Sequence, residues 1–248
     1  MVKVANAFLE SLKKEVHAHP AMNHPFLKKF GEGKLKPEGP RIFAEQYYQY
    51  SRNFSMYLAM LISIIPDEPA RKPLIKNLYE EYGGRSEEQR DMDLELVHAN
   101  IFRGFCNAVG ADLGHVVPLP ETSLFVERYF NLPKLHYIEA IAALGPGTEY
   151  IVPYIYRPIF DGLIKLGYKK EDLLFFDAHI TLDVEHSENI WESMEPYADN
   201  PEHQELMRRG TKYMLDARQV FWKGFAACNP RGAPVCPLVV QSVCRNNW

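Results

Sequence analysis

The chain has 248 residues, of which 46% are hydrophobic and 24% charged, as is ordinary for a globular protein. Its formal net charge of −4 gives no electrostatic case for nucleic-acid binding, and no basic run indicates a membrane surface. The first residues are amphipathic, without the apolar core of a signal peptide, and no apolar run is long enough to span a bilayer. We therefore expect a cytosolic protein.

Helical periodicity dominates the chain. The first expected helix runs from about residue 4 to 17 and is followed by a short helical turn over 23–32. Prolines and glycines then separate the longer helices that we expect over residues 40–65, 68–82, 86–108, 121–144, 148–166, 170–196 and 201–227. We expect the helix over 121–144 to bend near Pro133. No strand pattern or internal repeat is convincing. The sequence predicts an all-α single domain of seven or eight helices over residues 1–228, with a tail at 229–248.

The most informative stretch is residues 175–191. His179, Asp183 and His186 stand at i, i+4 and i+7, which places them on one stripe of a helix. The flanking residues are largely apolar or aromatic, and two imidazoles with a carboxylate are costly to bury unless they bind something. Imidazole and carboxylate together suit iron. The alternative is a solvated helix face that holds two histidines by accident.

Other acids and imidazoles fall among apolar neighbours on other helices. Glu149 lies in the first turn of the expected helix over 148–166, where it could instead be an acid stabilised by the helix dipole. His98 lies in the expected helix over 86–108, and Glu81 ends the helix over 68–82. A lone buried histidine is usually a core residue and a Glu-Glu pair is usually a solvated helix end, so a metal role is only one reading of each.

The chain resembles the heme-oxygenase-like diiron oxidases, relatives of the chlamydial p-aminobenzoate synthase and of the pyrroloquinoline-quinone cyclase. The matching segments are His24-Pro25-Phe26, residues 43–48, residues 77–81, residues 98–105 and the His-x-x-x-Asp-x-x-His stripe. The resemblance implies a heme-oxygenase-like helical bundle that often pairs as a homodimer. It also implies six metal ligands: Glu81, His98, Glu149, His179, Asp183 and His186.

The sequence departs from this family at several positions. Glu81 lies farther from His98 than the family's first glutamate lies from its first histidine, because residues 85–91 look inserted. Glu88, Asp91 and Glu95 therefore stay open as alternatives to Glu81. Leu27 replaces a sacrificial tyrosine of the p-aminobenzoate synthases, and Ile159 replaces a lysine. These two losses favour an external substrate over a protein-derived one.

The resemblance implies an enzyme that holds two Fe(II) ions, uses O2 and acts on a small amino-acid- or amine-derived substrate. The outcome would be oxidative fragmentation, nitrile or alkene formation, or N-oxygenation in a biosynthetic pathway, and manganese in place of one iron is left open. Aromatic side chains and arginines near the stripe are candidates for substrate contact, although surface ion pairing is an alternative for Arg157 and Arg103. The aromatic candidates are Tyr47, Tyr48, Tyr50, Tyr150 and Phe176, although aromatic residues at helical spacing are more often core, and Arg157 is the candidate for holding a substrate carboxylate.

Four other functions are compatible with an all-α chain. A p-aminobenzoate-synthase-like oxygenase is the first, although Leu27 and Ile159 argue against it. A metal-free hydrolase resembling thiaminase II would need a cysteine nucleophile, for which Cys106 is the one helical candidate. A non-catalytic helical binding protein would leave the acid–histidine set unexplained, and a heme-binding oxygenase has no use for clustered carboxylates. The role of Cys228, Cys236 and Cys244 is open.

Overall fold

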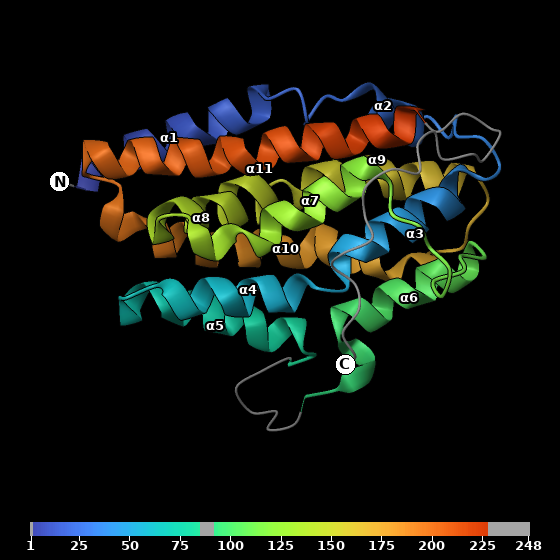
Figure 1. Ribbon diagram of the computed structural model, residues 1–248, viewed down its shortest axis with the longest axis horizontal. Coiled ribbons are helices and arrows are strands. Elements are labelled where there is room, and N and C mark those ends of the chain that lie inside the picture. Colours follow the sequence, from blue (N-terminus) through green and yellow to red (C-terminus); the bar gives the residue numbers. More distant parts are fainter. Residues whose placement is uncertain (1, 85–91, 228–248) are drawn as a thin grey trace.

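The computed structural model describes residues 2–84 and 92–227, without the side chains of 2–6, 181–186 and 226–227. Its regular structure is entirely helical in those ranges, which confirms the all-α class (Figure 1). The helices are more numerous than the seven or eight expected. They are α1 Val2–Ala18, α2 Pro25–Gly31, α3 Gly39–Ser51, α4 Phe54–Ile64, α5 Glu68–Glu81, α6 His98–Ala108, α7 Pro120–Phe130, α8 Tyr137–Leu144, α9 Val152–Lys165, α10 Leu174–Met194 and α11 Pro201–Ala227.

Two of the long helices expected from sequence are each divided. The helix expected over 40–65 breaks between α3 and α4, where the Asn53 side chain donates to the backbone carbonyl of Gln49. Asparagine competes in this way with the helical hydrogen-bond pattern, so it favours a helix end. The helix expected over 121–144 ends at Phe130 and resumes at Tyr137, with a 3-10 turn around Pro133 between. Periodicity persisted across the first break and concealed it. The second break falls at the bend expected near Pro133, where the helix ends altogether.

The helix expected over 86–108 is also shorter in the structure. Helix α6 begins at His98, and the described residues before it hold only the 3-10 turn Leu94–Leu96. Asp93 begins this turn, and its carboxylate accepts from the backbone N–H of Glu95. The later start places His98 at the first residue of a helix rather than in its middle.

Helix α10 lies inside the bundle, where it packs against α5, α6, α8 and α9. Helix α11 covers the opposite side of α8 and runs beside α1 along one edge of the molecule (Figure 1). The approach of α11 to α8 requires Gly210, because a Cβ there would lie 1.9 Å from the Glu139 carbonyl oxygen. The central position of α10 brings its side chains within reach of groups from several other helices.

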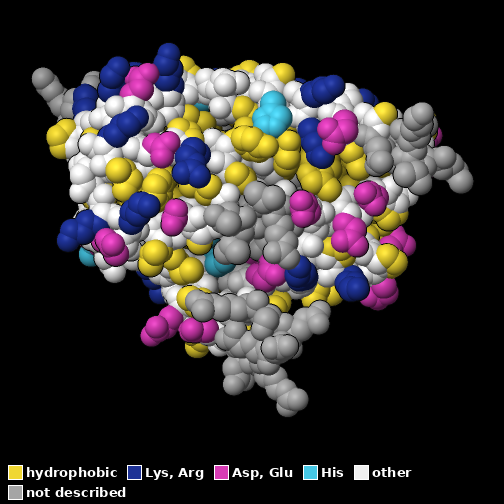
Figure 2. Space-filling view, turned by 180° about the vertical axis from the view of Figure 1, so that it is seen from behind, with side chains coloured by type: hydrophobic (Ala, Val, Ile, Leu, Met, Phe, Trp, Pro, Cys, Tyr) yellow, Lys and Arg dark blue, Asp and Glu magenta, His cyan; other side chains and the backbone are white. Residues whose placement is uncertain are grey.

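The surface is of mixed character. On the face shown in Figure 2, acidic and basic side chains are interspersed among hydrophobic ones. No helix in the described ranges combines the length and the apolar character that crossing a membrane requires.

Candidate metal centre

Glu81 is the last residue of helix α5 and lies on its buried face with Leu74 and Asn77. Gly83 follows in the left-handed region at φ 83°, which favours glycine, and a Cβ there would lie 2.1 Å from the Asp93 carbonyl oxygen. This turn brings the segment before α6 back against the end of α5. The Glu81 side chain is 4% exposed, so its carboxylate is among the buried acids of the described chain.

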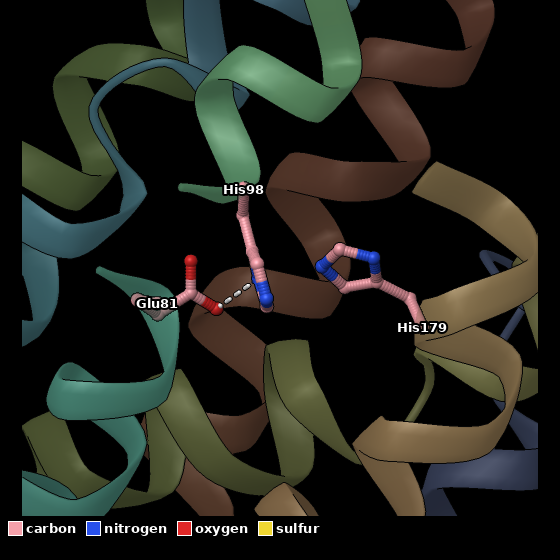
Figure 3. A group of neighbouring side chains, drawn as sticks. All are labelled: Glu81, His98 and His179. Carbon is pink, nitrogen blue, oxygen red and sulfur yellow. Dashed lines mark ion pairs between the residues drawn. The ribbon is translucent and has the colours of Figure 1, made fainter. Parts of the chain in front are cut away.

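His98 opens helix α6 beside that carboxylate. Its Nδ1 atom lies 2.9 Å from Glu81 Oε1, an ion-pair distance, and the imidazole is buried (Figure 3). Neither residue is near the other in sequence. Their meeting depends on the Gly83 turn and on the late start of α6.

His179 approaches from α10 on the other side of His98. The two imidazole centroids are 4.4 Å apart, and Figure 3 shows the rings side by side. His179 Nδ1 donates to the carbonyl oxygen of Phe175 at 2.6 Å, because a carbonyl can only accept. This hydrogen bond leaves Nε2 as the ring atom with a lone pair. A backbone carbonyl holding the second ring nitrogen is the usual arrangement of a metal-binding histidine.

Glu81, His98 and His179 each offer one ligand atom, and these atoms lie within 4.8 Å of one another. All three side chains are buried. Two imidazoles and one carboxylate are the donor set of non-heme Fe(II) oxygenases, and carboxylate with imidazole also suits diiron proteins. The residues present therefore fit iron.

Glu149 joins the same site from a π-helical turn, Gly145–Glu149, between α8 and α9. The turn requires small residues, because a Cβ at Gly145 would lie 2.2 Å from Ile190 Cγ2 and one at Gly147 would crowd Met214. The Glu149 side chain is 2% exposed. Single π-helical turns are frequent at functional sites. The sequence placed Glu149 in an ordinary first turn, so its π-helical setting was not expected.

These four side chains line one shared pocket. Thr148, Val152 and Tyr156 line it beside Glu149, and three of these positions, 149, 152 and 156, repeat at i, i+3 and i+7. That spacing is a helix-face signal that sequence reasoning left unused. The other described lining residues are Tyr50, Ser51, Phe54 and Phe175.

Part of the expected ligand set lies outside what the structure describes. Helix α10 continues through Asp183 and His186, but their side chains are outside the described residues. Glu88 and Asp91, two alternatives to Glu81, are outside them as well, as are Cys228, Cys236, Cys244 and the tail at 229–248. Glu95, the third alternative, is exposed in the 3-10 turn. Of the two described candidates, Glu81 and Glu95, Glu81 is the one that lies beside His98.

Of the candidates named from the sequence, Tyr50 is among the described residues that line the pocket, whereas Tyr47, Tyr150, Arg157 and Phe176 are not. Tyr47 lies one layer behind, with its hydroxyl 2.8 Å from that of Tyr156. Tyr150 turns toward α1, where its hydroxyl is 2.9 Å from His17 Nε2, and Arg157 is exposed. Phe176 is fully buried in the core beside the pocket residue Phe175. Arg103 is exposed and donates to the Tyr48 hydroxyl.

Comparison with known sequences identifies relatives over most of the chain. A family model described as iron-containing redox enzyme matches residues 41–219. The 4-aminobenzoate synthase of Nitrosomonas europaea is 30% identical over 233 residues, which cover 88% of this chain and 91% of that protein. The 4-chloro-allylglycine synthase of Streptantibioticus cattleyicolor is 24% identical over 229 residues, covering 88% and 82% of the two chains.

Solved structures show the same fold. A CADD-like protein of unknown function from Nostoc punctiforme superposes with a TM-score of 0.70 at 17% identity, over 90% of this chain and 96% of that one. A TenA homologue from Pseudomonas syringae pv. tomato gives a TM-score of 0.70 at 16% identity, over 91% and 96%. The family model matches most of the chain, and the buried cluster of Glu81, His98 and His179 lies within the matched residues. This chain belongs to the family of heme-oxygenase-like, iron-containing redox enzymes.

Proposed function

We propose that this protein is a non-heme diiron enzyme that uses O2 to oxidise a small substrate derived from an amino acid or amine. The observation that supports it most directly is the convergence of Glu81, His98 and His179, whose ligand atoms lie within 4.8 Å of one another in the buried interior. Glu149 lines the same pocket. Asp183 and His186 complete the proposed ligand set, because they follow His179 on α10 at helical spacing.

The names of two relatives support the substrate class. One is a 4-aminobenzoate synthase and the other a 4-chloro-allylglycine synthase. Both names describe a product that carries an amine and a carboxylate. We infer a substrate of the same general kind.

An external substrate fits this chain better than a protein-derived one. Leu27 and Ile159 stand where p-aminobenzoate synthases are expected to have a tyrosine and a lysine. Leu27 is 3% exposed and Ile159 fully buried, and neither is among the described residues that line the pocket. Their side chains pack in the core and offer no group that an oxidation could consume.

The protein's own residues would supply metal ligands, hold one ligand ring in place and keep the pocket wall apolar. Glu81 and Glu149 supply carboxylate oxygens, and His98 and His179 supply imidazole nitrogens, while the Phe175 carbonyl holds the His179 ring. Val152, Phe54 and Phe175 make much of the pocket wall apolar, so water competes less with a bound substrate. When bound, a pair of ferrous ions would supply the electrons that reduce O2.

A metal-free, thiaminase-like reaction receives no support from Cys106. Its thiol is fully buried in α6 and does not line the pocket. Burial, with a smaller contribution from Glu45, raises the pKa of the Cys106 thiol to about 12. A nucleophilic cysteine needs the opposite shift, because the thiolate is the reactive form.

The test is anaerobic titration of the metal-free protein with ferrous iron, followed by mixing with O2 in a stopped-flow spectrometer. We expect about two irons per chain and a transient visible absorption band. His98→Ala and His179→Ala should each abolish stoichiometric binding. His115→Ala is the matched control, because that imidazole is exposed and pairs with Asp112 on the surface.

Weak, non-stoichiometric iron binding that is the same in all four proteins would contradict the proposal. A second test, an oxygen-consumption assay with amino acids and amines, separates an oxidase from a non-catalytic binding protein. Stimulation of O2 uptake by a substrate, lost in His179→Ala, is the expected result.

A further inference from the structure

Ser51 carries a buried hydroxyl for which the protein supplies no hydrogen-bond partner. It is the last residue of α3, it is 8% exposed, and it lines the pocket together with Glu81 and His98. Among the residues that the structure describes, none donates to its Oγ atom or accepts from it. An unpaired hydroxyl in the interior is unfavourable, so a native protein that keeps one is expected to use it.

Other helical serines are satisfied from within the chain. Ser63 Oγ donates to the Met60 carbonyl at 2.7 Å, and Ser193 Oγ donates to the Asn189 carbonyl at 3.1 Å. Serine in a helix commonly makes such a bond to the preceding turn. Ser51 also follows a helical turn, but it does not make this bond. Its hydrogen is therefore not committed to the backbone of its own helix.

The rest of the described pocket wall offers little to hold a substrate carboxylate. Thr148 Oγ1 donates to the Ala143 carbonyl at 2.9 Å, so its hydrogen is already used. No lysine, arginine, asparagine or glutamine is among the described residues that line the pocket. A carboxylate bound there has no described side-chain cation to pair with, and it depends on hydroxyl donors and on bound metal.

A buried cation lies beside the wall that carries Ser51. Arg218 in α11 is the second-largest fully buried side chain among the described residues, and arginine is not deprotonated in proteins. Its guanidinium carbon is 5.2 Å from the centroid of the Tyr50 ring, which lines the pocket. The two Nη atoms donate to the hydroxyls of Tyr47 and Tyr129, at 3.3 and 3.4 Å. No described carboxylate pairs with this charge, so it makes the electrostatic potential on the α3 side of the pocket more positive.

We propose that the Ser51 hydroxyl donates a hydrogen bond to the carboxylate of the substrate, at a position that the charge of Arg218 favours for an anion. Ser51 is then a binding residue, and Arg218 acts on the substrate through its electric field alone. The inference rests on the proposed function, from which the amine-and-carboxylate class of substrate is taken. Glu81 and Glu149 would repel an anion in the metal-free pocket, whereas iron would offset their charge. We therefore expect the carboxylate to bind to the iron-loaded protein.

The test is calorimetric titration of the iron-loaded protein, without O2, with L-norvaline and with butylamine. The two probes differ by one carboxylate, and iron content is measured separately in each variant. Ser51→Ala removes the donor, and loss of a hydrogen bond to a charged group corresponds to an L-norvaline affinity lower by about ten- to a hundredfold. Butylamine should not distinguish Ser51→Ala from the unaltered protein.

Ser193→Ala is the matched control. It removes the same atom from a buried serine that is not among the described pocket residues, and it should leave both affinities unchanged. Urea unfolding of the metal-free protein gives a second readout that needs no ligand. Ser193→Ala breaks a hydrogen bond and should lower the urea midpoint, whereas Ser51→Ala breaks none and should leave the midpoint unchanged or raise it.

Three results at full iron content would overturn the inference and leave the proposed function in place. They are an unchanged L-norvaline affinity in Ser51→Ala, an equal loss for both probes, and failure of the unaltered protein to bind L-norvaline. A urea midpoint that falls as far in Ser51→Ala as in Ser193→Ala would also overturn it, because the hydroxyl would then have a partner within the protein. Failure of the unaltered protein to bind iron would overturn the proposed function and this inference with it.

Discussion

Two polar clusters lie in the core of this protein and differ in charge and in how their members are held. The acid–imidazole cluster consists of Glu81, His98, Glu149 and His179, which come from four separate segments and converge on one pocket. The arginine–tyrosine cluster surrounds Arg218 with phenols and aromatic faces. The first holds two carboxylates and two imidazoles, and the second holds a cation without a described carboxylate.

The difference indicates separate roles. A group of carboxylates and imidazoles is suited to a cation, whose binding offsets the cost of burying the acids. A cation among phenols and aromatic rings already has favourable contacts within the protein. We therefore expect the acid–imidazole cluster to determine metal binding and the arginine–tyrosine cluster to determine stability and the orientation of hydroxyl groups.

The largest effect that we expect is a loss of iron affinity in Glu149→Gln, in the acid–imidazole cluster. The change keeps the shape of the side chain but removes a buried negative charge, so iron affinity should fall by about a hundredfold or more. The free energy of unfolding of the metal-free protein should change by less than about 1 kcal/mol, because an amide is cheaper to bury than a carboxylate. Chelator competition and urea denaturation measure the two quantities. Glu202→Gln, at the exposed start of α11, is the control.

Arg218→Ala should show the reverse pattern. Truncation leaves a cavity and removes the contacts with Phe125, Tyr50 and Trp222, so we expect the free energy of unfolding to fall by about 3 kcal/mol. Iron content at saturation should be unchanged. Loss of iron from a variant that remains folded would show that the two clusters are not separate in function.

A smaller effect is expected at the turn that carries Glu149. A Cβ at Gly145 would lie 2.2 Å from Ile190 Cγ2, and the overpacking in Gly145→Ala should cost about 2 kcal/mol of unfolding free energy and weaken iron binding. Gly104→Ala is the control, because nothing lies within 4 Å of a Cβ at that helical position. It should stabilise the protein by about 0.5–1 kcal/mol. Equal stability of the two variants in thermal or urea unfolding would contradict the packing argument.

Local spacing within the sequence determined the helical class and the most conspicuous part of the site. The i, i+4, i+7 spacing of His179, Asp183 and His186 needs only the geometry of one helix, and α10 is helical through all three positions. Glu149 and His98 were placed in the site by family resemblance rather than by their surroundings. The same periodicity could not reveal the break after Ser51, because apolar residues continued across it, whereas Pro133 did predict a bend where the helix ends after Phe130.

Only the tertiary structure decided which remote groups meet. Glu81 and His98 come together because the Gly83 turn folds the chain back on itself, a contact that no spacing rule contains. Arg218 gave no sequence signal, since an arginine on a long helix ordinarily lies at the surface. Its burial follows from the packing of α11 against α7 and α8, which encloses it between aromatic rings. Periodicity reports the face that a helix buries, whereas the partners on that face depend on how all the helices pack.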